Sequence, residues 1–512
     1  MSGEILGAAQ ISADIDVSCD VAIVGTGAGG AVLAAGLAEA GLKVVMIEAG
    51  PYVTRQDFTL QESQSLPLMY QESGARSTTN KAITVLQGRA VGGSTAVNWT
   101  SCFRTPERIL EHWREKFGLE MDHTTLRPHF EAVERRLSIQ KWPKERANQN
   151  NQVIFDGCAK LGWKSGTMRR NVKGCADSGY CGMGCPVGGK QSMFNTYVPD
   201  AVGQGAMVYA DTYVQRIEVQ NDRVVALHGR VKLQQDPTAK GVSVTVRPKV
   251  AVLAAGALNG PALLLRSGLD GKGLVGRRTF LHPVVALMGH YKHVINPWYG
   301  APQSAHSHQF IDRGPQKMGY FFESAPLHPV LIGGSIKNFG TDHVQLMQKM
   351  KHMSAVLSLM VDGLMPHDVG GTVSLTPEGT PALDYPHSRW LKEAIRSATR
   401  HMAQLHFAAG ATEVASSHTH PRLLSPDQPI ANIDKWPVLA LEPGLFSAHQ
   451  MGGCTMGADP EASVVDLEHR FRGVPNLFVV DGSVLPTALG VNPSETIYGL
   501  SHRARPFVGN AV

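Results

Sequence analysis

Long hydrophobic runs are absent from this 512-residue chain. The longest apolar window, Val250–Leu265, is broken by Gly256, Asn259, Gly260 and Pro261, and it is too short to span a bilayer. The first twenty residues contain acids but no basic n-region, no twin arginine and no long apolar core, so they lack the pattern of a signal peptide. We therefore expect no transmembrane segment and a cytoplasmic protein.

A strong excess of one charge is also absent. The chain has 48 Lys and Arg against 43 Asp and Glu, a net charge of +5, and its basic residues form no dense stripe. Nucleic-acid binding is therefore not expected. The 54 glycines and 30 prolines follow no fixed period, which argues against collagen-like and repeat architectures. With 43% hydrophobic and 18% charged residues the chain is expected to be globular, and its length predicts two or three domains.

The chain does contain a glycine-rich turn near its N-terminus. An apolar run at residues 20–24 precedes Gly25, Gly27 and Gly30, and a helical pattern and a second apolar run ending at Glu48 follow. The first glycine allows a tight turn, the second lets backbone approach a pyrophosphate, and the third allows close packing of helix against strand. Glu48 can accept a hydrogen bond from a ribose hydroxyl. This βαβ pattern predicts a dinucleotide-binding site.

Three further segments favour FAD over NAD as the dinucleotide. Residues 88–98 form a second loop of small residues that lets backbone approach a flat ring. Residues 251–268 have the pattern of a strand and glycine turn that closes over an adenine nucleotide. The third segment is the Asp481-Gly482 pair at the end of an apolar strand. An NAD enzyme needs none of these loops, so FAD is the predicted cofactor.

The C-terminal run at residues 447–496 combines groups that suit a reaction site. His449 is a base that titrates near neutral pH, and Asn492, at the start of a predicted helix, can both donate and accept hydrogen bonds. Asp481-Gly482 lies between them, where backbone amides can face a phosphate or a ring. A base, an anion-facing turn and an orienting amide together predict catalysis.

Several of these segments also carry a family resemblance. They are VAIVGTGAGGAVLAAGLAEAGLKVVMIEAG, GRAVGGSTAVN, VLAAGALNGPALLLRSGL, LVGRRTFLHP, AHQMGGCTMG and VVDGSVLP…GVNPSETI. In this order along the chain they resemble the glucose–methanol–choline (GMC) oxidoreductase family of flavoproteins. Within that family, the ending GVNPSETI is most similar to cholesterol oxidases, and CGMGCPVGGKQSMFNTYVPDA is similar to long-chain fatty alcohol oxidases.

The resemblance implies how FAD is held. Many relatives carry a histidine bonded to the flavin where this chain has Val97, so noncovalent FAD is expected. Val214 would contact the adenine and Asn98 would lie by the flavin ring, while Asp481-Gly482 would meet the diphosphate or ribityl region. The predicted cofactor-binding residues are Gly25, Gly27, Gly30, Glu48, Gly92, Gly93, Asn98, Val214, Ala255, Asp481 and Gly482.

The resemblance also implies the chemistry. An aliphatic alcohol is too weak an acid to ionise unaided, and neutral imidazole suits the role of its base. His449 would be that base during hydride transfer to flavin N5, and Asn492 would hold the same hydroxyl. The predicted function is oxidation of a hydrophobic or bulky alcohol to an aldehyde or ketone. The alternative is an FAD-containing lyase or decarboxylase on the same fold.

A cysteine cluster raises a separate question. Cys175, Cys181 and Cys185 fall within eleven residues, and Pro186 follows the last of them. Their spacing is compatible with an iron–sulfur cluster. It is similar to the spacing in the catalytic subunits of FAD-dependent sugar dehydrogenases, and this resemblance implies a [3Fe-4S] cluster that would pass electrons to a quinone, a cytochrome or a small subunit. The other interpretation is that they are buried, inert thiols that shape a tight loop.

The expected fold class is α/β, or α+β over the whole chain. A Rossmann-like FAD-binding domain would be formed by residues 18–285 and 440–507. A substrate-binding domain, residues 286–439, would be inserted between them and built on an antiparallel sheet with helices. This middle region has a different texture, with most of the histidines and one clear amphipathic helical pattern.

Overall fold

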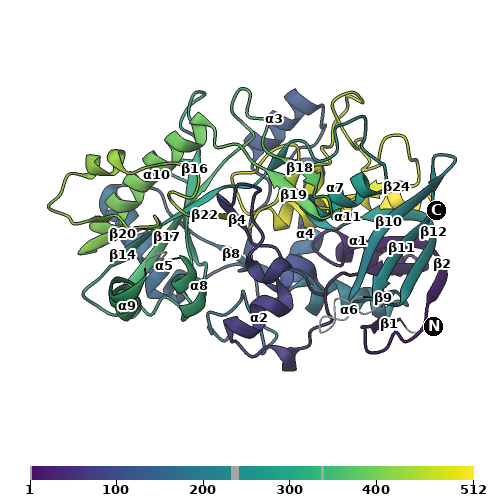
Figure 1. The fold of residues 1–512 in the computed structure, drawn as a ribbon, viewed down its shortest axis with the longest axis horizontal. Helices are drawn as coiled ribbons and strands as arrows, with labels where there is room; N and C mark the ends of the chain where they lie inside the picture. The colour runs from purple at the N-terminus through teal and green to yellow at the C-terminus, as the bar shows by residue number, and fades with distance from the viewer. Residues whose placement is uncertain (1–2, 232–240, 336–338) are drawn as a thin grey trace.

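The computed structural model describes residues 3–231, 241–335 and 339–512. Within these ranges the chain forms an elongated molecule with one large sheet at each end (Figure 1). Both chain termini lie at the end that holds the first sheet.

The first sheet has the strand order β1-β9-β3-β2-β12-β11-β10, with β24 also paired to β12. Its strands are β1 (Glu4–Leu6), β2 (Ile15–Val24), β3 (Val44–Ile47), β9 (Met207–Tyr209), β10 (Thr212–Gln220), β11 (Arg223–Val231), β12 (Ser243–Leu253) and β24 (Leu477–Val479). β2 pairs in parallel with β3 and β12, so that Val21 lies opposite Val44 and Val250. Every residue of β3 is buried, as expected for a parallel strand covered on both faces.

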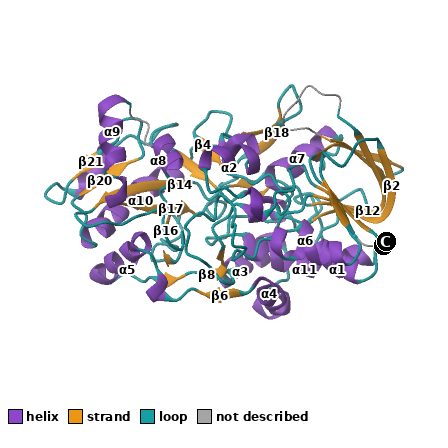
Figure 2. Ribbon diagram, turned by 90° about the horizontal axis from the view of Figure 1, so that it is seen from below, coloured by secondary structure: helices purple, strands orange, loops and turns teal. Residues whose placement is uncertain are grey.

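Helices cover this sheet on both sides. They are α1 (Gly30–Glu39), α4 (His123–Leu137), α6 (Tyr197–Gly203), α7 (Gly256–Arg266) and α11 (Ser494–Gly509). Figure 2 shows α1, α6 and α11 on one side of the sheet and α7 on the other. α1 is rich in alanine and glycine, and these small side chains let it pack closely on its neighbours α6 and α11.

The second sheet has the order β21-β20-β14-β17-β16-β15-β7, and β22 links β14 to β4. Its strands are β4 (Ile83–Val85), β7 (Gly166–Thr167), β14 (Val284–His290), β15 (Ala305–Ser307), β16 (Tyr320–Ser324), β17 (Met353–Met360), β20 (Glu413–Ser416), β21 (Leu423–Leu424) and β22 (Leu445–Ser447). All its pairings are antiparallel except that between β22 and β4. The amphipathic helix α10 (Arg389–Ala408) packs on β14, β17 and α5 (Gln149–Leu161).

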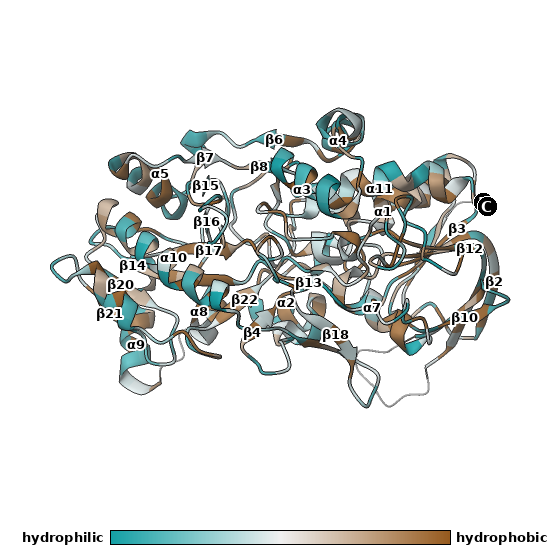
Figure 3. Cartoon of the chain, turned by 90° about the horizontal axis from the view of Figure 1, so that it is seen from above, coloured by the Kyte–Doolittle hydropathy of each residue, from teal (hydrophilic) through white to brown (hydrophobic). Residues whose placement is uncertain are grey.

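Shorter elements complete the described chain. They are β5 (Ser101–Cys102), β6 (Ile139–Lys141), β8 (Arg169–Asn171), β13 (Thr279–Phe280), β18 (Thr372–Leu375), β19 (Pro381–Asp384), β23 (Met451–Gly452), α2 (Glu62–Met69), α3 (Glu107–Phe117), α8 (Pro329–Ser335) and α9 (Gly340–Gln348). Figure 3 shows hydrophobic colouring on the interior strands β12 and β17. Over the three described ranges, no helix combines the length and the apolarity needed to cross a membrane.

This architecture confirms the predicted α/β fold class, with a Rossmann-like unit beside a largely antiparallel sheet with helices. The second sheet also takes β4, β7 and β22 from residues that the predicted boundaries assign to the FAD-binding domain. The boundaries themselves stay a prediction.

Candidate active site

A cavity of about 780 Å³ runs from the glycine turn after β2 to the second sheet. Its size is typical of ligand sites. Eleven of the thirteen residues predicted to bind cofactor or substrate line it: Gly25, Gly27, Glu48, Gly93, Asn98, Val214, Ala255, His449, Asp481, Gly482 and Asn492. The fold therefore brings together, at one cavity, residues from nearly the whole length of the chain.

The other two predicted residues, Gly30 and Gly92, lie behind the cavity wall. A Cβ on Gly30 would stand 2.0 Å from the carbonyl oxygen of Gly25, so only glycine lets α1 start this close to the turn. Gly92 has φ +97°, which favours glycine, and its N–H donates to Thr26 Oγ1 at 2.9 Å. Both glycines shape the loops whose other residues face the cavity.

The glycine loops form a cradle that fits a dinucleotide. Gly25 has φ +104°, and a Cβ there would lie 2.3 Å from the carbonyl oxygen of Ala254. A Cβ on Gly27 would meet only Gly93 Cα, at 3.7 Å, so the backbone of both loops is open to an approaching group. Because α1 begins directly after this turn, its N-terminal amides also face that space. The cradle fits the pyrophosphate of FAD.

Two buried carboxylates border the cradle. Glu48, directly after β3, accepts hydrogen bonds from Thr26 N and Oγ1 at 3.1 and 2.7 Å and from Gly50 N at 2.9 Å. Asp481, directly before the 3₁₀ turn Gly482–Val484, accepts from Gly256 N at 2.7 Å. Burial raises the pKa of both carboxyls, and these hydrogen bonds oppose the shift. Asp481 thus ties the turn after β24 to the turn that starts α7, in addition to lining the cavity.

His449 and Asn492 meet at the far end of the cavity, near the second sheet. His449 Nε2 lies 3.2 Å from Asn492 Nδ2, and His449 Nδ1 lies 3.1 Å from Nδ1 of His282. Removal from bulk water lowers the pKa of His449 to about 4, so its imidazole is neutral at pH 7. The two residues predicted to act on the substrate are therefore neighbours in the fold.

Glu323 is a member of this polar group that sequence analysis missed. It is fully buried on β16, lines the same cavity, and accepts a hydrogen bond on Oε2 from Gln303 Nε2 at 2.6 Å. Burial raises its pKa to about 8, against opposing contacts from Asn492 and Gln303. Within the described structure its Oε1 atom has no hydrogen-bond partner. The sequence does carry a signal for Glu323, because this acid directly follows three aromatic residues in the segment YFFES. All five residues of that strand are buried in the structure.

The wall around this polar group is apolar. Leu357 and Leu359 of β17, Val284 of β14 and Phe446 of β22 line the cavity on the side of the second sheet. A substrate with its reacting hydroxyl at His449 would therefore place its remaining atoms against hydrocarbon. This surface favours a hydrophobic substrate.

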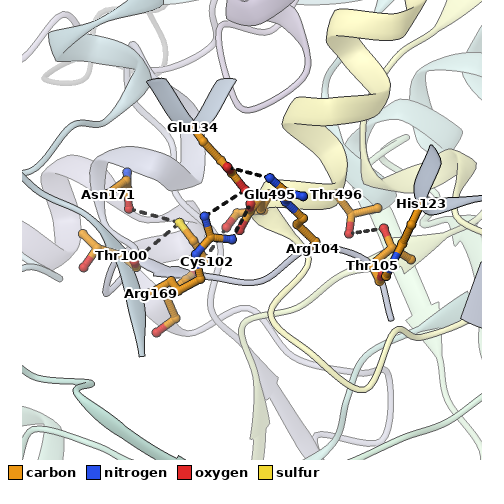
Figure 4. A network of polar contacts seen from close by, with 12 residues as sticks. Thr100, Cys102, Arg104, Thr105, His123, Glu134, Arg169, Asn171, Glu495 and Thr496 are labelled. Atoms are coloured by element: carbon orange, nitrogen blue, oxygen red, sulfur yellow. Dashed lines mark hydrogen bonds and ion pairs between the residues drawn. The ribbon is translucent and has the colours of Figure 1, made fainter. Parts of the chain in front are cut away.

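An ion network fixes the start of α11, where Asn492 enters the site (Figure 4). Arg104 makes two contacts with Glu134, from Nε at 2.6 Å and Nη2 at 2.8 Å. Arg169 bridges Glu134 at 2.8 Å and the buried Glu495, three residues after Asn492, at 3.2 Å. Two carboxylates thus share two guanidinium groups. Burial raises the pKa of Glu495, and the adjacent Glu134 adds to the effect.

Replacing Glu495 by glutamine is expected to stabilise the protein at pH 8. The raised pKa means that the folded state binds a proton more tightly than the unfolded state, so wild-type stability falls as pH rises above the ordinary glutamate range. Glutamine mimics the protonated form, and the gain should be on the order of 1–2 kcal/mol, shrinking towards pH 5. Denaturant unfolding at both pH values measures it, with the exposed Glu131→Gln as control. A variant less stable than wild type at pH 8 would contradict the assignment.

The structure gives no support to a metal cluster at the cysteines. No set of three or more His, Cys, Asp and Glu side chains among the described residues is arranged to hold a metal ion. Cys175, Cys181 and Cys185 are partly buried free thiols, and burial raises the pKa of Cys175. Of the two interpretations made from the sequence, the structure favours thiols that shape a loop.

This cysteine loop supports the cavity wall through a buried lysine. Lys190 Nζ donates to the backbone carbonyls of Ala96 at 2.8 Å, Asn98 at 2.7 Å and Cys181 at 2.9 Å. Burial lowers its pKa to about 8. Sequence analysis missed Lys190, and no local pattern identifies it. It links the cysteine loop to residues 96–98 beside the cavity.

Comparisons with known proteins agree with this site. Two family models described as GMC oxidoreductase match residues 67–284 and 366–501, and a model described as FAD binding domain matches residues 20–65. Long-chain-alcohol oxidase FAO4A of Arabidopsis thaliana is 31% identical over 512 residues, covering 95% of this chain and 68% of that protein. Cholesterol oxidase of Mycobacterium tuberculosis is 25% identical over 551 residues, covering 95% and 90%.

A solved structure shows the same fold. Pyridoxine 4-oxidase from Mesorbium loti has a TM-score of 0.70 at 19% identity, covering 96% of this chain and 99% of that one. The predicted family, enzyme class and FAD cofactor are confirmed by these matches. The chain belongs to the GMC oxidoreductase family and is an FAD-dependent oxidoreductase.

Proposed function

We propose that the protein oxidises a hydrophobic or bulky alcohol to an aldehyde or ketone, with noncovalently bound FAD as the oxidant. The observation that carries this proposal is one continuous cavity that joins the glycine cradle to the polar group of His449, Asn492 and Glu323. Its apolar wall supports a substrate rich in hydrocarbon. The similarity to a long-chain-alcohol oxidase and a cholesterol oxidase points the same way.

The residues of the cradle suit FAD as resident cofactor. Gly25, Gly27 and Gly93 leave room for the pyrophosphate, and Glu48 lies where a carboxylate can accept from a ribose hydroxyl. Val97 lines the cavity with a side chain that has no atom able to bond the flavin covalently, which supports noncovalent binding. Once bound, FAD supplies the acceptor for the hydride that leaves the alcohol carbon.

The chain must then hold the hydroxyl oxygen and remove its proton. Asn492 and His449 both present polar atoms at the end of the cavity and can hold the oxygen. Two groups compete as proton acceptor, His449, which the family resemblance implies, and Glu323, which the fold adds. They differ in pH dependence, because an acceptor with a pKa of about 4 is active throughout pH 6–9 whereas one with a pKa of about 8 gains activity across that range.

The function is tested by reduction of the bound flavin without oxygen. Purified FAD-loaded protein is mixed anaerobically with aliphatic, aromatic, terpenoid, steroid and sugar alcohols, and the flavin absorbance is followed. We expect bleaching by the apolar alcohols and none by the sugars. Reoxidation by air, a quinone, a cytochrome or a dye then identifies the electron acceptor. A flavin that stays oxidised with every alcohol would refute alcohol oxidation and favour a lyase or decarboxylase.

The variant His449→Ala is expected to keep its yellow FAD while losing flavin reduction by about 10²-fold, the usual cost of one polar contact to the reacting oxygen. The hydrogen bonds of the His449 ring go to His282 and Asn492 and not to the glycine cradle, so cofactor binding should be unchanged. Stopped-flow reduction and the flavin content per chain measure the two effects. Flavin reduction at a near-wild-type rate would show that His449 takes no part in the reaction.

A further inference from the structure

A second histidine stands directly behind His449. His282 is fully buried, two residues after β13, and its ring packs edge-on against His449 at 5.3 Å and against Phe321 at 5.6 Å. It is not part of the cavity wall. Its backbone is anchored, because the His282 N–H donates to Asp362 Oδ1 at 3.0 Å. Its hydrogen bond to His449 connects His282 to the site.

The contacts of His282 fix where its proton lies. The backbone N–H of Gly490 donates to His282 Nε2 at 3.0 Å, so this nitrogen must present a lone pair. A neutral imidazole with a lone pair on Nε2 carries its proton on Nδ1. Burial, the neighbouring His449 and Arg108 all lower the pKa of His282, so the ring is neutral. The heavy atoms thus assign the Nδ1–H tautomer to His282.

This proton determines the state of His449 in turn. His282 Nδ1 lies 3.1 Å from His449 Nδ1, and two N–H groups cannot face each other at that distance. Since His282 donates, His449 Nδ1 accepts, and neutral His449 has its proton on Nε2. Nε2 is the nitrogen next to Asn492 at the cavity.

We propose that His282 is a positioning residue that fixes the tautomer of His449, so that His449 faces the cavity as a hydrogen-bond donor through Nε2–H. The peptide group of Gly490 sets the direction of the whole chain of hydrogen bonds, because a backbone N–H cannot reverse its polarity. The assignment of tautomers depends only on these contacts. Its consequence for catalysis rests on the proposed function.

The proposed Nε2–H of His449 needs an acceptor on Asn492. With Nδ2 directed at His449 Nε2, two donors would meet at 3.2 Å, while Asn492 Oδ1 is buried and has no partner in the described structure. Turning the amide by 180° exchanges two atoms of similar shape, removes the meeting of two donors, and places Nδ2 at the buried position that Oδ1 held. Oδ1 then accepts from His449 Nε2–H. Asn492 can therefore supply the acceptor that a donor tautomer of His449 requires.

As a consequence, His449 and Glu323 would have different roles at the alcohol hydroxyl. An Nε2–H group holds the alcohol oxygen and stabilises the negative charge that develops on it, but it has no lone pair to take the proton. A group that can take the proton is the carboxylate of Glu323, which lines the cavity together with Asn492. His282 thereby selects Glu323 over His449 as the proton acceptor.

The backbone at position 282 allows a sharp test. His282 has φ +46°, a left-handed conformation that asparagine and aspartate tolerate best among residues with a side chain. His282→Asn keeps an N–H donor next to His449, whereas His282→Asp presents an acceptor when it is studied at a pH high enough to ionise this buried carboxyl. The two variants are nearly the same size and differ in the direction of the hydrogen bond. Flavin content and melting temperature show whether each has folded.

The tautomer is read by ¹⁵N–¹H correlation NMR of FAD-loaded protein carrying ¹⁵N-histidine, with the His449 signals identified by their loss in His449→Gln. We expect Nε2–H on His449 in the wild type and in His282→Asn, and a switch to Nδ1–H in His282→Asp. Nδ1–H in the wild type would overturn the proposal. An unchanged Nε2–H in folded His282→Asp would also overturn it, because the tautomer would then be set elsewhere.

Flavin reduction separates this inference from the proposed function. If an alcohol reduces the wild-type flavin, His282→Asp should slow that step on the order of 10²-fold through loss of the donor. His282→Asn should stay close to the wild-type rate. If no alcohol reduces the flavin, the proposed function fails, while the NMR result still decides the tautomer.

Discussion

Replacement of Glu323 by glutamine is expected to slow reduction of the flavin by an alcohol roughly 10³-fold, within the range for loss of a general base. Glutamine keeps the length of the side chain and an oxygen that can accept from Gln303 Nε2. It has no carboxylate to take the hydroxyl proton. The side chain is fully buried at the cavity, so solvent cannot readily replace it. Stopped-flow reduction under anaerobic conditions measures the change.

The pH dependence of the same step identifies the acceptor. Burial raises the pKa of Glu323 to about 8, and only its ionised form accepts a proton. The wild-type rate should therefore rise from pH 6 to pH 9, with its midpoint near pH 8, and in Glu323→Gln this rise should disappear. His449, with a pKa of about 4, remains neutral over the whole range and cannot produce the rise.

Ser101→Ala is a matched control, because Ser101 is hydrogen-bonded to Gln303, which is in turn hydrogen-bonded to Glu323. Ser101 Oγ donates to Gln303 Oε1 at 2.5 Å and so lies one contact further from Glu323. Ser101→Ala should keep the rise with pH and most of the rate. A wild-type rate that is flat from pH 6 to pH 9, together with a fast Glu323→Gln variant, would return the role of base to His449.

The parts of the site that could be predicted are those encoded by short local patterns. Gly25, Gly27 and Glu48 belong to one βαβ unit, whose spacing fixes their relation in space before the rest of the chain is known. His449 and Asn492 belong to segments whose order along the chain matches a family. The same patterns predict the parallel sheet, because each strand is an apolar run followed by a turn or helix signal.

The parts that could not be predicted arise from pairings between distant strands. Glu323 reaches the cavity because β16 pairs with β17 in the second sheet, and no motif near residue 323 records that contact. His282 meets Gly490 across 208 residues. A histidine before a proline has no signature of a proton-directing role. The cysteine spacing, by contrast, suggested a site that the structure does not support. Among the described residues, the thiols that are close in sequence are not gathered around a common centre.

A second large effect is expected from substitution of Gly29, which lies in the glycine turn but is not one of the three glycines of the G-x-G-x-x-G pattern. Gly29 is the N-cap of α1 with φ −82°, a conformation open to any residue, so its substitution is limited by space alone. A Cβ there would lie 1.7 Å from the backbone carbonyl oxygen of Val480. This carbonyl belongs to the backbone, so it cannot rotate away from the new Cβ as a flexible side chain could. Gly29→Ala must therefore push α1 away from the turn after β24.

That displacement should abolish FAD binding. Gly29 and Asp481, the residue after Val480, both line the cavity, so the shift opens the cradle on two sides. We expect purified Gly29→Ala to be colourless and destabilised by about 3 kcal/mol, the upper range for overpacking. The control is Gly203→Ala at the end of α6, where an added Cβ meets no atom within 4 Å and alanine favours the helix. It should stay yellow and at least as stable as wild type. A yellow Gly29→Ala protein with an unchanged unfolding midpoint would show that α1 and the end of β24 are not held at this distance.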